Sequence, residues 1–241
     1  MSINNNRSIQ PEPMEEQKSG SMFFPVMLAV LTGLFLAFII LPSWLPSLVN
    51  STMGSDPKAF WYLSRSTAII SYTLLWISMV LGVTMTGKLA QHLLGVPMHF
   101  DLHLFISILG LGFSLVHGLL LMGDAYIAFS LSQVLVPFTS VNYLPFYVGL
   151  GQVAFYMWGI IILSHYVRKL TGRKVWRAIH YSGYVTFLMA LVHGLTSGTD
   201  GGTGWAFYMY WISAGVLTFL VMYRILVHRF GLTKVAQAAR D

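Results

Sequence analysis

Long runs of apolar residues recur along this chain, and the short segments between them carry most of the charge. An apolar run of about 20 residues, folded as a helix, matches the thickness of the hydrocarbon core of a bilayer. Apolar residues make up 56% of the chain and charged residues only 9%, whereas about 25% of the residues of an average soluble protein are charged. The runs do not alternate apolar and polar residues as membrane strands do. The sequence therefore predicts an all-α, polytopic membrane protein.

Six runs are long enough to span a bilayer, and together they form one predicted domain over residues 21–230. The approximate bounds of the six predicted helices are 22–41, 61–83, 102–123, 146–167, 178–197 and 205–228. The first run is interpreted as a retained helix, because its polar leader is long and no small-residue cleavage site follows it. Residues 1–20 are predicted to be a disordered cytoplasmic tail, and residues 231–241 a short cytoplasmic tail.

Two connections between the runs have unusual compositions. Residues 124–145 are largely apolar and contain two prolines, so we expect an interfacial segment with a short helix that covers the outer mouth of the bundle. The sequence GTDGGTG at 198–204 looks superficially like a phosphate-binding loop, but it lacks the Lys-Ser/Thr pair and the preceding strand. It is interpreted as a plain turn.

The distribution of charge predicts an orientation in the membrane. One side of the predicted bundle is rich in basic residues, and the other side holds most of the acidic residues of the loops. The basic residues of the first side are Lys88, Arg168, Lys169, Arg173, Lys174, Arg177, Arg229, Lys234 and Arg240. The loops of the other side hold the acidic residues Asp56, Asp124 and Asp200 and one basic residue, Lys58. Cytoplasmic loops carry an excess of Lys and Arg, so both termini are predicted to be cytoplasmic, in a bacterial cytoplasmic membrane. Topology thus accounts for the net charge of +6, and no nucleic-acid partner is expected.

Histidine is the residue type that most strongly indicates chemistry in this chain, which has eight histidines and no cysteine. The lack of cysteine excludes disulfides, thiolate catalysis, iron–sulfur clusters and thiolate zinc sites within the chain. His103 and His117 lie in the third predicted span, and His180 and His193 lie in the fifth. These two spans run in the same direction, so His103 shares one depth with His180, and His117 shares another with His193. The two levels are about 20 Å apart at 1.5 Å per residue.

Two pairs of facing imidazoles suit two b-type haems stacked across the membrane between helices 3 and 5. Haem iron accepts axial imidazole nitrogens, and the flat porphyrin is apolar enough to fit between helices. His103 and His180 would hold the iron of the inner haem, and His117 and His193 that of the outer haem. Gly118 and Gly194 each follow an outer histidine, and small residues allow close approach. The alternative is a polar histidine network in a haem-free transporter or structural subunit.

One spacing does not agree with a straight helix. Thirteen residues separate His180 from His193, and at about 100° per residue this leaves their directions about 140° apart. Either the fifth helix is distorted, or the two haems are offset about the axis of the bundle.

The other histidines lie near predicted cytoplasmic ends of helices and are interpreted as interfacial groups that reach water. They are His92, His99, His165 and His228. His99 and His103 are four residues apart and would share a helix face, but no third ligand for a metal ion is evident. The metal pair is therefore the weaker interpretation.

At these residues the chain resembles the ferric-reductase-like transmembrane domain family. That superfamily includes ferric reductases, NADPH oxidases and the bacterial haem-containing membrane partner of methionine sulfoxide reductase. The similarity covers roughly 60–228 and rests on the spacing of the two histidine pairs and on three segments. The segments are RSTAIISYTLLWISMVLG at 65–82, GDAYIAFSLSQVLVPF at 123–138 and WRAIHYSGYVTFLMALVHG at 176–194. The resemblance implies two bis-histidine haems b and electron flow from the cytoplasmic haem to the outer haem.

The resemblance also bears on Arg65, which occupies a position similar to an NADPH oxidase arginine near the outer haem. The alternative for Arg65 is a side chain that snorkels to the outer surface. Leu121 stands where the oxidases have a polar residue, which counts against oxygen reduction. Relatives of this type continue into a flavin and nicotinamide domain, but here no G-x-G-x-x-G follows a strand. The chain is therefore expected to have no flavin or NAD(P) site.

The expected function is transfer of electrons across the membrane by a ferric-reductase-like oxidoreductase subunit. The expected donor is a separate cytoplasmic flavoprotein or a quinol, and the acceptor on the outer side is ferric iron, oxygen or a soluble redox protein. Two alternatives stay open: a haem membrane subunit of a periplasmic reductase system, and a haem-free structural or transport subunit of a larger membrane complex. The basic residues 168–177 are mainly a topology signal, and docking of an acidic flavoprotein or anionic lipid is a second interpretation.

Overall fold

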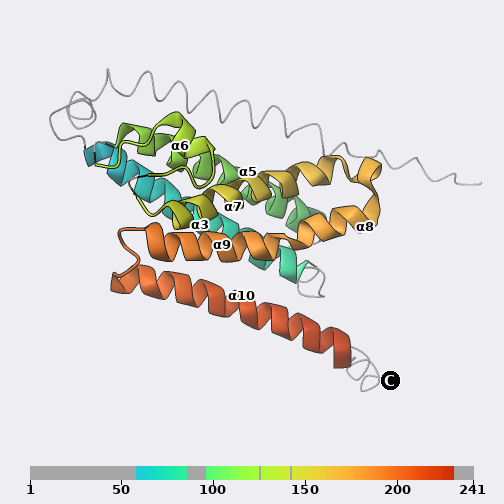
Figure 1. The fold of residues 1–241 in the computed structure, drawn as a ribbon. Coiled ribbons are helices and arrows are strands. Elements are labelled where there is room, and N and C mark those ends of the chain that lie inside the picture. Colours follow the sequence, from blue (N-terminus) through green and yellow to red (C-terminus); the bar gives the residue numbers. More distant parts are fainter. Residues whose placement is uncertain (1–57, 86–95, 125, 142, 231–241) are drawn as a thin grey trace, which may run out of the picture. The chain divides into compact units, whose positions relative to one another are not determined.

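The computed structural model describes residues 58–85, 96–124, 126–141 and 143–230. The first predicted span, both predicted tails, Lys88 and His92 lie outside the described residues. Every regular element in the described part is a helix, and no strand occurs there (Figure 1). The all-α prediction is confirmed for this part of the chain.

Four helices in the described residues are long and apolar enough to cross a membrane. They are α3 (Lys58–Thr84), α5 (Val96–Leu120, continued by the 3₁₀ turn η1, Leu121–Gly123), α7 (Pro145–Tyr166) and α10 (Gly204–Phe230). They correspond to the second, third, fourth and sixth predicted spans. α5 begins six residues earlier than predicted, because Pro97 falls in the first turn of the helix, where proline is tolerated.

The predicted fifth span is not one regular helix. It is divided into α8 (Arg168–Tyr181) and α9 (Gly183–Ser197), which meet at Ser182. The Ser182 hydroxyl donates to the carbonyl oxygen of Ile179 at 2.6 Å, and a side chain that bonds back to the preceding turn bends a helix. Gly183 follows directly, and Ser–Gly pairs are common sites of kinks. α9 alone has 15 residues, fewer than the about 20 that a bilayer requires.

The basic segment between the fourth and fifth predicted spans was expected to be a loop, and this prediction was wrong for its second half. Gly172 has φ 81° and ψ 158°, a conformation that favours glycine, and it separates the turn after α7 from a helical stretch. Arg173, Lys174 and Arg177 therefore lie on α8. Their charge lowers the local hydropathy without opposing a helix, because Lys and Arg are good helix formers.

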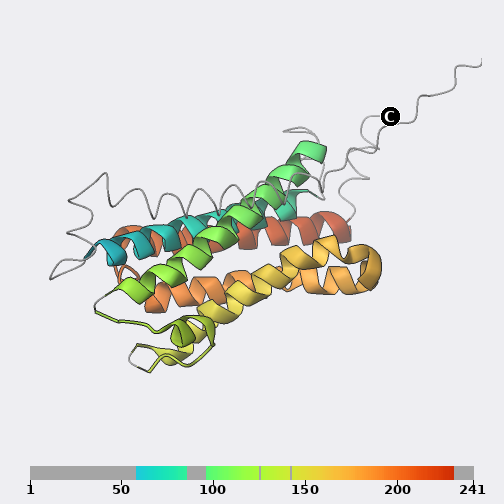
Figure 2. The same cartoon turned by 90° about the horizontal axis from the view of Figure 1, so that it is seen from above.

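The helices form two closely packed pairs. α3 packs against α5, α7 packs against α9, and α10 contacts both α3 and α9. α8 connects α7 to α9 at one end of these helices, and the connection that carries the short helix α6 (Leu131–Leu135) lies at the opposite end (Figures 1 and 2). The histidines of α5 are thereby placed between an end marked by α8 and an end marked by α6.

An aromatic cluster joins three of the helices. Tyr72 of α3 stacks against Phe187 of α9, with ring centres 5.8 Å apart, and meets Tyr210 of α10 edge-on at 4.8 Å. The Tyr72 hydroxyl also forms a buried hydrogen bond of 2.6 Å with the Ser213 hydroxyl. Hydrogen bonds between helices are a main source of association in membranes, where burial of apolar surface contributes little.

Candidate functional site

Two cavities lie among the helices, and a pair of histidines lines each. The outer cavity, toward the α6 end, has a volume of about 230 Å³ and is lined by His117 and His193. The inner cavity, toward the α8 end, has a volume of about 420 Å³ and is lined by His103 and His180. The names follow the predicted orientation.

Three side chains separate the two cavities, because each of them lines both. They are Leu75, Trp158 and Thr186. Thr186 is the most deeply buried of the three, with an exposed fraction of 1%. The two cavities are therefore distinct sites with a shared apolar wall.

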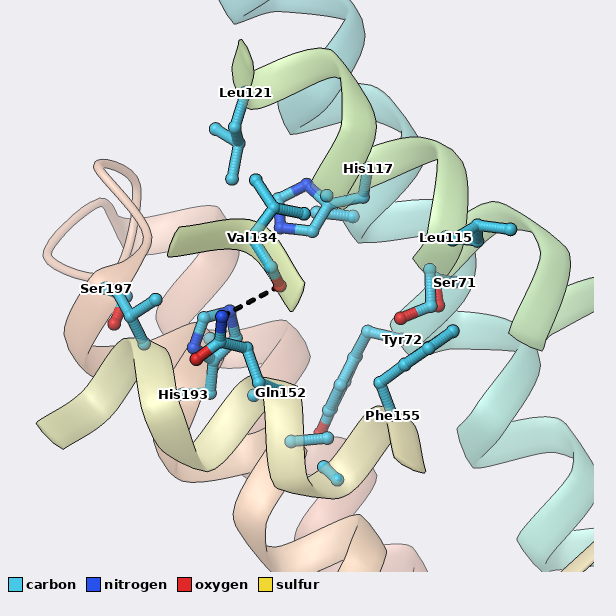
Figure 3. Close-up of a pocket in the computed structure, with 18 of the residues that line it drawn as sticks. Ser71, Tyr72, Leu115, His117, Leu121, Val134, Gln152, Phe155, His193 and Ser197 are labelled. Atoms are coloured by element: carbon cyan, nitrogen blue, oxygen red, sulfur yellow. Dashed lines mark hydrogen bonds between the residues drawn. The ribbon is translucent and has the colours of Figure 1, made fainter. Parts of the chain in front are cut away.

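The histidine rings face one another in two pairs. The ring centres of His103 and His180 are 6.2 Å apart, those of His117 and His193 are 6.4 Å apart, and both pairs have an interplanar angle of 69°. Figure 3 shows His117 and His193 reaching toward the same cavity from α5 and α9. These are the two pairs that the predicted depths put together. The break at Ser182 falls between His180 and His193, so these two rings need not follow the directions of one straight helix.

Three of the four rings are held through Nδ1 by main-chain carbonyl oxygens on neighbouring helices. The three hydrogen bonds, each 2.9 Å long, run from His103 to Ser78, from His117 to Ser64 and from His193 to Tyr147. A carbonyl oxygen can only accept, so Nδ1 carries the proton and Nε2 keeps an unshared electron pair. Metal-ligating histidines have this arrangement, in which the outer hydrogen bond fixes the tautomer and orients the ring.

The fourth ring is positioned by an aromatic contact. Trp176, one helical turn before His180, stacks on the His180 ring with centres 5.2 Å apart and planes 24° apart. The indole Nε1 of Trp176 is buried and has no hydrogen-bond partner in the described part of the chain. Trp176 also lines the inner cavity. Its indole ring positions the His180 ring, and its N–H group is a hydrogen-bond donor without a partner among the described residues.

Two glycines leave room for histidine rings. A Cβ atom on Gly82 of α3 would lie 3.2 Å from Cε1 of His103, and a Cβ atom on Gly151 of α7 would lie 2.7 Å from Nδ1 of His193. The second distance is too short for a side chain, so the hydrogen at Gly151 is required for the observed position of the His193 ring.

The glycines that follow the outer histidines in the sequence have other neighbours. A Cβ atom on Gly118 would lie 3.3 Å from Val134, and one on Gly194 would lie 2.5 Å from the Tyr210 hydroxyl. Gly118 allows α6 to pack closely against α5, and Gly194 allows α10 to pack closely against α9. Neither glycine makes room for a histidine ring. Sequence spacing gave no signal for Gly82 and Gly151, because they lie on helices other than those of the paired histidines.

The two pairs fit a metal ion held between opposite imidazoles. An imidazole nitrogen binds such an ion at about 2.0–2.1 Å and lies about 1.1 Å from the ring centre, so two rings on one axis have centres about 6.3 Å apart. The observed separations are 6.2 and 6.4 Å. No group of three or more His, Cys, Asp or Glu that could hold a bare metal ion occurs in the described residues. In the described residues, no third ligand joins His99 and His103.

The linings of the two cavities differ in charge. The outer cavity is lined by apolar and neutral polar side chains together with His117 and His193, and no Asp, Glu, Lys or Arg is among its described lining residues. The inner cavity has three arginines in its lining, Arg173, Arg177 and Arg224, together with His165. A positive lining therefore distinguishes the inner cavity from the outer cavity.

The connection between α5 and α7 covers part of the outer cavity, as the sequence predicted. Its residues Gln133, Val134 and Leu135 line the cavity. Gln152 of α7 holds this segment, donating to the carbonyl oxygen of Gln133 at 2.6 Å and to that of Val134 at 2.8 Å. The bond to Val134 is the dashed line in Figure 3. The Tyr156 hydroxyl donates to the carbonyl oxygen of Leu135. The location of this connection at a membrane interface stays a prediction.

Arg65 is not among the residues that line the outer cavity. It forms an ion pair with Asp200 in the turn at 198–204, and its guanidinium lies 5.1 Å from the ring centre of Trp61 and 6.0 Å from that of Trp205. The described contacts of Arg65 thus join α3 to the start of α10. A role for Arg65 in binding a cofactor stays a prediction.

The histidines outside the two pairs differ from the expectation in one case. His99 is only 3% exposed, so the interpretation of this residue as an interfacial group that reaches water was wrong. Its Nε2 donates to the carbonyl oxygen of Leu81 at 3.1 Å, because a short polar contact with α3 is available where the sequence suggested a helix end. His165 lines the inner cavity and contacts Phe100, with ring centres 5.3 Å apart. The side chain of His228 is outside the described residues.

No protein family, curated protein or solved structure was found to match this chain. The described residues define an all-helical protein with four candidate membrane spans and two cavities, each bounded by a facing pair of imidazoles.

Proposed function

We propose that this protein carries electrons across a membrane by means of two b-type haems, one in each cavity. His103 and His180 hold the inner iron, and His117 and His193 hold the outer iron. A haem with two histidine ligands supplies one-electron transfer at the edge of the macrocycle. The observation that carries the proposal is the presence of two imidazole pairs whose ring centres, 6.2 and 6.4 Å apart, match the spacing about one axial metal.

The other residues of the two sites orient the ligands and exclude water. The carbonyl oxygens that accept from Nδ1 hold the rings and raise the basicity of Nε2. Leu75 and Trp158 form an apolar wall between the sites, and the α6 connection, held by Gln152, covers the outer cavity. The outer haem would thus lie among apolar and neutral polar side chains, whereas the inner haem would also meet three arginines.

The membrane topology that goes with this function has six spans, with both termini on the cytoplasmic side of a bacterial cytoplasmic membrane. Residues 178–197, which comprise the last turn of α8 and the whole of α9, make the fifth span, broken at Ser182, and the run at 22–41 makes the first. This is the arrangement implied by the resemblance to the ferric-reductase-like transmembrane domain. The basic surface of α8, with five Arg or Lys residues exposed to the surroundings, supports a cytoplasmic location for that end.

Electrons enter at the α8 end, from a separate flavoprotein or a quinol, and leave at the α6 end. The acceptor there is ferric iron, oxygen or a soluble redox protein, and because His117 and His193 would both hold the outer iron, the acceptor would take electrons without binding to that iron. The chain thus acts as the electron-transfer part of a ferric-reductase-like oxidoreductase.

The haem content of the purified protein tests the proposed function directly. We expect two haems b per chain in a pyridine haemochrome assay, with a reduced α-band in the b-type region, because there are two imidazole pairs. About one haem per chain would support the single-haem subunit of a periplasmic reductase instead. Protein that is folded and contains no haem would reject the proposal and favour a structural or transport subunit.

Gly151→Ala is expected to perturb the outer haem alone. The new methyl group would lie 2.7 Å from Nδ1 of His193, so the ring must move away from its hydrogen bond with Tyr147 and from the outer iron. We expect a lower outer-haem content or a shifted outer midpoint potential in a redox titration. Gly159→Ala is the matched control on the same helix, because its methyl group would meet only Leu111, at 3.9 Å. Equal behaviour of the two variants would contradict the assigned role of His193.

A further inference from the structure

Three arginines from two separate helices meet at the inner cavity. Arg173 and Arg177 lie on α8, four residues apart and therefore on one face of that helix, and Arg224 lies on α10. All three line the cavity that contains His103 and His180. Three cations have thus been brought to one cavity by segments that are distant in the sequence.

The described residues supply no carboxylate to balance these cations. The described part of the chain contains three acidic residues, Asp101, Asp124 and Asp200, and none of them lines the inner cavity. Arg177 donates to the Tyr181 hydroxyl at 3.0 Å, and Arg224 also donates a hydrogen bond to that hydroxyl, so each of these two guanidinium groups uses one of its five N–H donors. Most of the hydrogen-bonding capacity of the cluster is therefore available to an anionic ligand.

A neutral donor lies in the same cavity. The indole Nε1 of Trp176 is buried there and has no partner among the described residues. An unused donor in a buried position is costly, and it indicates a ligand that accepts a hydrogen bond. The outer cavity has no comparable cluster, since its described lining contains no arginine or lysine.

We propose that Arg173, Arg177 and Arg224, with the indole N–H of Trp176, bind the propionate carboxylates of the inner haem. This inference rests on the proposed function. Two axial histidines fix the position of the iron but leave the macrocycle free to rotate about the axis between them. Guanidinium groups bind carboxylates through paired, charge-assisted hydrogen bonds, so the cluster sets that rotation and turns the carboxylate edge toward the α8 end.

The same donors would also suit the phosphate of an anionic lipid, because both ligands present negatively charged oxygen atoms. The carboxylate assignment follows from the location of the cluster. The arginines line the cavity that the inner histidines line, and Trp176 is in direct contact with His180. The experiment below separates the two sources.

The first test compares variants of the full-length, haem-loaded protein. Arg173→Gln, Arg177→Gln and Arg224→Gln are made singly and together, and Lys174→Gln is the matched control, an exposed α8 residue outside the cavity lining. Loss of one charge-assisted hydrogen bond corresponds to dissociation of the inner haem that is about tenfold faster. The inner midpoint potential should also fall, because a nearby cation favours the reduced iron. The outer potential should not change, which shows that the variants are folded.

The second test removes the carboxylates from the ligand. Protein stripped of haem is reloaded with either haem b or its dimethyl ester, and each arginine variant is compared with the unaltered chain. The effect of the arginine substitutions should disappear with the ester, because only the free carboxylates are recognised. An effect of equal size with the ester, seen only in vesicles with anionic lipid, would assign the cluster to lipid phosphate and overturn the inference.

The outcomes distinguish this inference from the proposed function. Two haems in the unaltered chain, with unchanged inner potential and dissociation rate in the triple arginine variant, would reject the carboxylate site and leave electron transfer intact. A folded chain that binds no haem would reject both.

Discussion

We expect His117→Leu and His103→Leu each to remove one of the two proposed haems, and to remove different ones. The two residues lie on the same helix, α5, but each faces a different partner: His117 faces His193 at 6.4 Å, and His103 faces His180 at 6.2 Å. Leucine has a comparable volume and no nitrogen, so one axial ligand is lost while packing is largely retained. Redox titration should therefore show one remaining b-type component in each variant, with His193→Leu matching His117→Leu and His180→Leu matching His103→Leu.

The consequences for electron flow differ between the two sets. Loss of the outer haem should allow the inner haem to be reduced but abolish exit of electrons, whereas loss of the inner haem should abolish entry. His165→Leu is the control, since His165 lines the inner cavity but its ring contacts Phe100, and it should keep both haems. If His103→Leu matched His193→Leu instead of His180→Leu, the assignment of the pairs would be incorrect.

The apolar runs were sufficient to predict the long helices. α3, α7 and α10 agree with the predicted spans to within three residues at each end, because a bilayer demands about 20 apolar residues in succession. The depths of the four histidines followed from the rise per residue of two parallel spans, and the rings do meet in those pairs. Hydropathy determines the length of the spanning helices almost directly, and helical geometry determines the depth of each histidine.

The supports of the histidine rings could not be predicted in the same way. Main-chain carbonyl oxygens have no sequence signature, and Gly82 and Gly151 lie on helices that carry no paired histidine. The helix break at Ser182 depends on one hydroxyl hydrogen bond, and hydropathy does not record it. Each of these features depends on which helices are neighbours, and a single sequence does not specify that.

The charged residues show the same limit. The excess of Arg and Lys in 168–177 was interpreted mainly as a topology signal. The number of basic residues does not show where their side chains point. Only the packing of α10 beside α9 shows that Arg224 lines the same cavity as Arg173 and Arg177. Arg65 was expected either near the outer haem or as a side chain that snorkels to the outer surface, and its described partners are Asp200 and two tryptophans.

Reduction of the haems should start from the face of the membrane that carries α8. That face presents an exposed basic helix, and an acidic flavoprotein would be attracted to it, so its association rate should fall steeply with ionic strength. Exposed charges are screened beyond about 10 Å at 0.1 M salt. The measurement is stopped-flow haem reduction in vesicles of known orientation, at low and high ionic strength. A membrane quinol as donor would give rates that depend little on salt.

Variants of the exposed basic residues make this test specific. Lys169→Glu with Lys174→Glu reverses charge on α8 outside the inner cavity lining, so association with an acidic flavoprotein should slow while both haem potentials stay unchanged. NADPH alone should not reduce the haems, because the 241 residues contain no dinucleotide fingerprint of a strand followed by G-x-G-x-x-G. Rapid reduction by NADPH without another protein or quinol would show a cofactor site that the sequence does not reveal. Reduction only from the opposite face would reverse the proposed direction of electron flow, because the basic end of the molecule would then be where electrons leave.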